Sequence, residues 1–156
     1  MMIREYAVGG NDMKLLVSAC LLGEPCRYDG KSKPCEGVIR LGERHELIPV
    51  CPEVMGGLPT PRPPAELQAD GRVVNRLGVD VSDAYRRGAE ETLRQGRLHG
   101  CTYAILKEKS PSCGTGRIYD GSFHGVLTAG DGVTARVLTQ AGITVLGEND
   151  ARIDEL

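Results

Sequence analysis

The sequence predicts a single α/β domain in which a mostly parallel sheet is flanked by helices. Four short apolar runs rich in Val, Leu and Ile cover 13–20, 47–50, 102–106 and 143–146. Segments of helical character separate these runs, and strands that alternate with helices at such spacing are typical of a parallel sheet with right-handed crossovers. A chain of 156 residues is most simply one domain, because it is long enough to bury its own core.

We expect an N-terminal extension, one domain and a short C-terminal tail, with boundaries at 1–12, 13–150 and 151–156. The first segment ends in Gly-Gly-Asn-Asp and lacks the apolar stretch of a signal peptide. The strand over 13–20 then leads into a loop, 21–30, that is dense in turn formers and polar side chains. Long connections of this composition are often functional.

The strand over 47–50 is preceded by a weak helical pattern at 38–41 and followed by a proline-rich segment. Four prolines fall within 59–64 and hold the chain near polyproline II geometry. Such a stiff segment can hold Arg62 at a fixed place over a site, or it can be a rigid linker with a solvated arginine, and the two interpretations have equal weight. Residues 67–74 then predict a hairpin with an Asp-Gly turn.

Two longer helices are expected in the second half of the chain. One begins at Asp80 or Ser82 and continues to His99, where a glycine follows as the stop. The other is capped by Asp131 and ends at Gly142. The inward-facing residues are expected to be Val81, Ala84, Tyr85, Ala89 and Leu93 in the first helix, and Val133, Val137, Leu138 and Ala141 in the second.

Composition excludes several classes of function. The net charge of −2 argues against a broad basic surface, so we expect no nucleic-acid partner. No apolar run approaches the roughly 20 residues that cross a bilayer, so we expect no membrane partner and a cytoplasmic location. In a reducing compartment, the six cysteines indicate metal binding or catalysis rather than structural disulfides.

Three of the cysteines occupy the same kind of position, just past an apolar strand. Cys20 ends the first strand, Cys51 follows the second and Cys113 follows the third. Because the carboxyl ends of parallel strands face one crevice, we expect these three thiols to converge. Cys101, which opens a strand, is expected to pack in the core, and Cys35 to lie in a polar turn.

Several kinds of site are compatible with three separated cysteines. The paired spacings of zinc ribbons and of thioredoxin-like motifs are absent, although a three-thiolate zinc site remains open. Cys113 as a nucleophile is a second alternative, with His124 as its candidate base in a loop expected over 118–125. A small-molecule binding module is a third. An iron–sulfur cluster matches best, because thiolates are its usual ligands and its size tolerates ligands from three loops.

Several motifs of the chain resemble those of the thiouracil desulfidase family. The matches are VSACLLG at 17–23, CRYDG at 26–30, PVCPE at 49–53, GGL at 56–58, PR at 61–62, LK at 106–107, SPSCG at 110–114, YDG at 119–121 and GDGV at 130–133. Their density from 13 to about 148 makes the resemblance specific. It implies a Rossmann-like domain with an oxygen-sensitive 4Fe-4S cluster that three cysteines hold, while the fourth iron binds the sulfur of the substrate.

The resemblance also implies roles for individual residues. The cluster ligands are expected to be Cys20, Cys51 and Cys113. Glu53 and Ser110 are expected to activate the attacking water, although Glu53 also fits a helix-start carboxylate that satisfies backbone donors.

Three further residues within these motifs are expected to contact the substrate: Asp29, Arg62 and Ser112. Cys26 also lies in a matching motif, but we leave it outside the ligand set.

The expected reaction is hydrolysis of the C=S bond of a thiolated pyrimidine of the 2-thiouracil or 4-thiouracil type. It yields the oxo base and sulfide without net redox change. A thiocarbonyl sulfur is a soft ligand, and an iron with an open position polarises the C=S bond as a Lewis acid. The chain has no additional C-terminal domain of the kind that accompanies action on thiolated tRNA in some relatives, which favours a free thiolated base or nucleoside.

Overall fold

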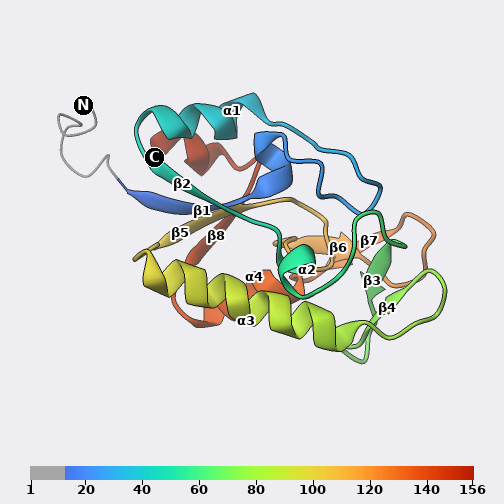
Figure 1. The fold of residues 1–156 in the computed structure, drawn as a ribbon. Helices are drawn as coiled ribbons and strands as arrows, with labels where there is room; N and C mark the ends of the chain where they lie inside the picture. Colours follow the sequence, from blue (N-terminus) through green and yellow to red (C-terminus); the bar gives the residue numbers. More distant parts are fainter. Residues whose placement is uncertain (1–12) are drawn as a thin grey trace.

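A four-stranded parallel sheet forms the centre of the protein in the computed structural model, which describes residues 13–156 (Figure 1). The strand order is β2-β1-β5-β8, with β1 at Lys14–Ser18, β2 at Glu46–Val50, β5 at Tyr103–Leu106 and β8 at Thr144–Gly147. All three strand pairs are parallel. The predicted mostly parallel α/β domain is therefore confirmed.

Helices cover both faces of the sheet. One face carries α1 (Glu36–Ile39), the 3-10 turn η3 (Arg40–Glu43) and the C-terminal 3-10 turn η4 (Ala151–Glu155), while the other carries α2 (Pro52–Met55), α3 (Ser82–Leu98) and α4 (Val133–Gln140). Figure 1 shows α3 and α4 side by side below the sheet, with α1 above it. None of the helices in the described part of the chain is long and apolar enough to cross a membrane.

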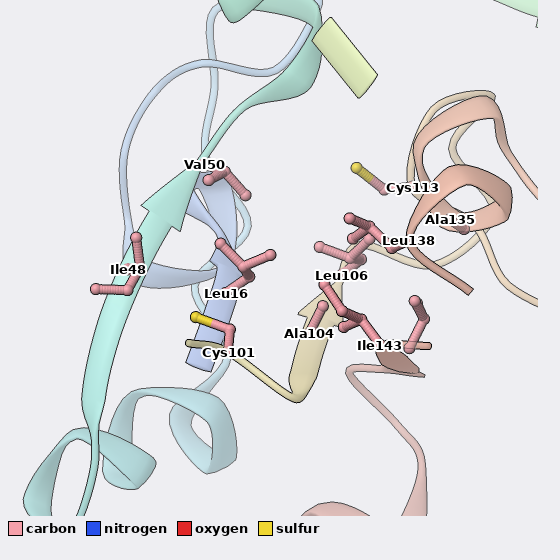
Figure 2. Close-up of a cluster of buried hydrophobic side chains, with 11 residues drawn as sticks. Leu16, Ile48, Val50, Cys101, Ala104, Leu106, Cys113, Ala135, Leu138 and Ile143 are labelled. Atoms are coloured by element: carbon pink, nitrogen blue, oxygen red, sulfur yellow. The ribbon is translucent and has the colours of Figure 1, made fainter. Parts of the chain in front are cut away.

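The alternation of side chains along β1 produces two apolar clusters, one on each face of the sheet. Leu15 and Val17 pack toward the α1 side and Leu16 toward the α3 and α4 side, and all three side chains are fully buried. Figure 2 shows the second cluster, in which Cys101 packs near Leu16 at one end and Cys113 lies at the other. Cys101 is thus a core residue, as predicted.

Two small antiparallel hairpins extend beyond the sheet. The first pairs β3 (Ala65–Leu67) with β4 (Val73–Asn75), which confirms the predicted hairpin. The second pairs β6 (Arg117–Tyr119) with β7 (Leu127–Ala129). The expected loop over 118–125 is therefore wrong at its start, because three-residue strands are too short to show an alternating pattern.

The start of α4 also differs from the prediction. Asp131 does not cap the helix: its Oδ1 accepts a hydrogen bond from the backbone N–H of Gly116 at 2.7 Å, and Gly132 occupies the N-cap position. A Cβ atom at Gly132 would overlap the backbone of Ser112, so this site requires glycine. The face of α4 that packs inward includes Thr134, whereas Ala141, expected to face inward, is exposed.

The last residues, expected to form a tail, pack onto the domain. Ile153 of η4 is buried in the cluster on the α1 side. The Nδ1 atom of His45 accepts a hydrogen bond from Met13 N at 3.0 Å, so Nε2 carries the proton and donates to the main-chain oxygen of Leu156 at 2.8 Å. His45 therefore joins the start of β1 to residue 156. The predicted extension over 1–12 lies outside the described residues.

Two glycines allow α2 to lie directly against α3. A Cβ atom at Gly56 would overlap the carbonyl oxygen of Ala84, and one at Gly88 would overlap that of Pro52. The guanidinium of Arg87 in α3 also donates to the carbonyl oxygen of Gly56 at 2.9 Å. This close crossing sets the distance between the first turn of α2 and the middle of α3.

Replacing Gly88 with Ala should destabilise the protein, because the new methyl group must push α2 away from α3. Overpacking of this kind costs about 1–3 kcal/mol, which chemical denaturation measures. The matched control is Gly37→Ala in α1, where a Cβ atom meets nothing within 4 Å, so its stability should equal or exceed that of the wild type. Equal stability of the two variants would contradict the close crossing.

Candidate functional site

A cavity of about 520 Å³ lies at the carboxyl ends of the central strands. Cys20 follows β1 within the 3-10 turn η2 (Ala19–Leu22), Cys51 follows β2, and Cys113 lies in the loop after β5. All three residues line this cavity. Parallel strands have thus brought together side chains from distant parts of the chain, as predicted.

A fourth thiol, that of Cys26, belongs to the same wall. Hydrogen bonding to the Cys20 thiol is the main reason that the pKa of Cys26 rises to about 11. The Cys26 thiol in turn raises the pKa of Cys51, and the Cys51 Sγ lies 3.7 Å from the carbonyl oxygen of Cys26. The position of Cys26 within the CRYDG motif was the sequence feature that pointed to it.

The loop that carries Cys20 and Cys26 is held by backbone hydrogen bonds. The carbonyl oxygen of Cys20 accepts from Lys33 N at 2.9 Å, and that of Leu21 accepts from Cys35 N at 2.9 Å. Cys35 packs against the apolar cluster on the α1 side and is not among the residues that line the cavity. The loop over 21–30 is therefore an ordered part of the site.

The turn over 110–114 presents Cys113 and Ser110 to the cavity. The Ser110 Oγ accepts hydrogen bonds from the backbone N–H groups of Ser112 at 3.1 Å and Cys113 at 2.9 Å. Its hydroxyl proton is left to donate to a ligand. Burial, followed by the nearby Glu53 carboxylate, raises the pKa of Cys113 to about 12.

Two residues expected to contact the substrate are not among those that line the cavity. Ser112 is 1% exposed, and its hydroxyl hydrogen-bonds the Thr134 hydroxyl at 2.8 Å, which fastens the turn to α4. Asp29 is exposed, and it accepts a hydrogen bond from Lys31 N at 3.0 Å. Both side chains therefore stabilise local structure, and Ser110 is the serine of this turn that faces the site.

Glu53 lies in the first turn of α2 and faces the cavity. Its Oε1 accepts from the Arg62 Nε at 3.1 Å and from Nη2, while its Oε2 accepts from the Tyr85 hydroxyl at 2.8 Å. These partners are side chains from other elements, and no hydrogen bond links the carboxylate to the helix backbone. The alternative role as a helix-start cap is thus not supported.

Arg62 directs all five of its N–H donors to acceptors of the protein. Nη1 donates to the carbonyl oxygen of Pro59 at 3.2 Å and to the Thr60 hydroxyl at 3.1 Å, while Nη2 donates to the carbonyl oxygen of Cys26 at 3.0 Å. The remaining contacts are those to Glu53. Its side chain is only 5% exposed, so the geometry favours a positioning role over the expected substrate contact.

Tyr85 is the residue of this network that sequence reasoning placed only in the core. It comes from α3, is 3% exposed and lines the cavity. Burial raises the pKa of Tyr85, so its hydroxyl stays protonated and donates to Glu53. Its sequence position within an apolar helix face gave no indication that its hydroxyl reaches a carboxylate on another element.

The donor set of the cavity suits iron rather than a histidine-dependent reaction. Thiolates are the usual ligands of iron–sulfur clusters, and four cysteines line this cavity. Within residues 13–156, no three His, Cys, Asp or Glu side chains are arranged to hold a single metal ion. None of the three histidines of the chain, all within those residues, lines the cavity.

The fold and the cavity define an α/β protein with a thiol-lined pocket at the carboxyl edge of a parallel sheet. Residues 15–150 match the model of the family described as 2-thiouracil desulfurase, and the chain belongs to this family. The resemblance inferred from the motifs is therefore confirmed.

Two relatives match nearly the whole chain. A solved structure of a 4Fe-4S-dependent thiouracil desulfidase, TudS, is 49% identical, with a TM-score of 0.85 over 92% of this chain and 95% of that one. The uncharacterized protein YbbK of Bacillus subtilis (strain 168) is 41% identical over 145 residues, which cover 87% of this chain and 96% of the relative.

Cys51→Ser should prevent the protein from retaining iron and sulfide after anaerobic reconstitution, since a cluster ligand must be a soft thiolate. Cys101→Ser is the matched control, because this residue packs in the core away from the cavity; its iron content should equal that of the wild type. Equal iron loss in both variants would contradict the ligand assignment. Iron loss in Cys26→Ser as complete as in Cys51→Ser would add Cys26 to the ligands.

Proposed function

We propose that this protein is a desulfidase that hydrolyses the C=S bond of a thiolated pyrimidine of the 2-thiouracil or 4-thiouracil type. The products are the oxo base and sulfide, and no net redox change occurs. One observation carries the proposal: a wall of thiols and a clamped carboxylate, that of Glu53, face the same cavity. Membership of the family and the similarity to the solved structure of a thiouracil desulfidase support it.

A 4Fe-4S cluster is the cofactor that the thiols of this cavity fit, with Cys20, Cys51 and Cys113 as its proposed ligands. When bound, it supplies a Lewis-acidic iron for the soft sulfur of the thiocarbonyl. The pKa values of Cys51 and Cys113 lie above the ordinary range, so both thiols must lose protons when they bind iron.

Glu53 is the proposed general base. It takes a proton from the water whose oxygen attacks the thiocarbonyl carbon, and this oxygen becomes the carbonyl oxygen of the product. Arg62 and Tyr85 hold both carboxylate oxygens in place, so little reorganisation is needed when the water is bound. Ser110, whose Oγ accepts two backbone hydrogen bonds, is proposed to donate its hydroxyl proton to the water or the pyrimidine.

The proposed partner is a small molecule, a thiolated base or nucleoside, and the proposed location is the cytoplasm. A cysteine-dependent enzyme without a cluster is less well supported, because a Cys113 nucleophile would need a base and His124 is not part of the cavity wall. A noncatalytic binding module does not explain why a carboxylate in the cavity is fixed by a buried arginine and a buried tyrosine.

Anaerobic reconstitution followed by a turnover assay tests the proposal. The loaded protein should convert 2-thiouracil or 4-thiouracil to uracil and release one sulfide for each uracil formed. In ¹⁸O-labelled water the new carbonyl oxygen should carry the label. Absence of turnover by iron-loaded protein would reject the proposed function, and equal turnover by cluster-free protein would reject the cluster as its cofactor.

Glu53→Gln should reduce turnover by roughly 10² to 10⁴, the usual contribution of general acid–base catalysis. The amide preserves the shape of the side chain, so iron content should stay near that of the wild type. Steady-state kinetics and iron analysis measure the two effects. Full turnover would remove Glu53 from the mechanism, and joint loss of iron and activity would show that the carboxylate supports the loop without testing its chemical role.

Tyr85→Phe should lower kcat by roughly 10-fold to 100-fold, since it removes a hydrogen bond to a charged carboxylate. KM and iron content should change little, because the ring still fills its place in α3. Tyr103→Phe in β5 is the matched control, because Tyr103 packs on the opposite face of the sheet. This variant should have the kcat and KM of the wild type. A fall in kcat of the same size in both variants would contradict a specific role for Tyr85.

A further inference from the structure

Phe123 is an aromatic residue that the core does not use. It is the only phenylalanine of the chain, and it belongs to neither of the two apolar clusters. It is half-buried in the loop between β6 and β7 and lines the same cavity as the thiols. A large apolar ring placed on a cavity wall instead of in the core is available to a ligand.

The backbone at Phe123 adopts a conformation that bulky residues avoid. Its φ angle is +62°, in the left-handed region. Non-glycine residues persist in this conformation only when their surroundings hold them, and such residues often occur at functional sites. Glu66 of β3 provides this restraint, since its Oε1 accepts from Gly121 N at 2.9 Å and from Phe123 N at 3.1 Å. Gln68 adds a hydrogen bond to the carbonyl oxygen of Gly121 at 3.2 Å.

A cation further restrains the ring. The guanidinium carbon of Arg76, which follows β4, lies 5.6 Å from the centroid of the Phe123 ring, a distance typical of a cation–π contact. Arg76 and Glu66 both line the cavity. The first hairpin therefore contacts both the backbone and the side chain of Phe123, and these contacts favour the observed position of the ring before a ligand arrives.

We propose that Phe123 is the stacking wall of the substrate pocket, against which the flat pyrimidine ring lies while its sulfur is directed to the thiol-lined end. The assignment rests on the proposed function for the identity of the ring. Its physical basis is that aromatic side chains stack on conjugated bases and that a fixed ring loses little entropy on binding. Phe123 therefore selects planar conjugated heterocycles, and Glu66 is the positioning residue that holds it.

Equilibrium binding tests this assignment without reliance on turnover. Uracil and 5,6-dihydrouracil carry the same N–H and C=O groups. Only uracil is flat and conjugated throughout, because dihydrouracil lacks the C5=C6 double bond. By anaerobic calorimetry, the cluster-loaded wild type should bind uracil more tightly than dihydrouracil. Phe123→Ala should weaken uracil binding roughly 5-fold to 100-fold, the range that loss of one base–aromatic stack produces, and should remove the preference.

Two further variants separate stacking from a change in the loop. Phe123→Tyr keeps the aromatic ring and should keep the preference for uracil. Val126→Ala alters an exposed residue of the same loop that is not part of the cavity wall, and should bind as the wild type does. Thermal melting and iron content confirm that each variant is folded and loaded.

The stacking assignment is overturned if Phe123→Ala retains the preference, if Phe123→Tyr loses it to the same extent, or if the wild type does not prefer uracil. These outcomes are separate from the test of the proposed function. A wild type that shows Phe123-dependent uracil binding but no desulfuration would reject the function and keep the stacking wall. Desulfuration without any dependence on Phe123 would do the reverse.

Discussion

The site depends on the buried ion pair between Glu53 and Arg62. The two side chains are 14% and 5% exposed, and a buried charge of this kind persists only when its partners satisfy it. Arg62 satisfies Glu53 and also the carbonyl oxygen of Cys26. One guanidinium therefore joins the carboxylate of α2, the cysteine loop after β1 and the proline-rich segment, so that loops distant in sequence share one geometry.

Backbone packing provides the frame for this pair. Gly56 and Gly88, at the crossing of α2 and α3, let the backbones of the two helices come into direct contact. That approach places the Tyr85 hydroxyl 2.8 Å from Glu53. The parallel strands bring the thiols together, because their carboxyl ends lie at one edge of the sheet and the residues that follow face the crevice there. The chemistry of the site thus follows from where strands and helices end.

Much of this arrangement could be predicted from local sequence. The apolar runs identified the four strands of the main sheet, the Asp-Gly turn identified the first hairpin, and the positions of Cys20, Cys51 and Cys113 after strands indicated their convergence. Other features could not be predicted, because they depend on neighbours distant in sequence. Asp131 is of a residue type that often caps helices. Its carboxylate instead accepts a hydrogen bond from the backbone N–H of Gly116.

The sequence by itself determined the α/β class, the family and the presence of a thiol site at the strand ends, because these follow from periodicity, turn chemistry and motifs that are local in the chain. Only the tertiary structure decided which polar side chains face the cavity. Ser110 and Ser112 are two residues apart in one motif, but Thr134 draws the second toward α4. Likewise, Arg62 is committed to Glu53, and Phe123 is left on the cavity wall. Such choices depend on hydrogen-bond partners that folding brings near, and no local pattern encodes them.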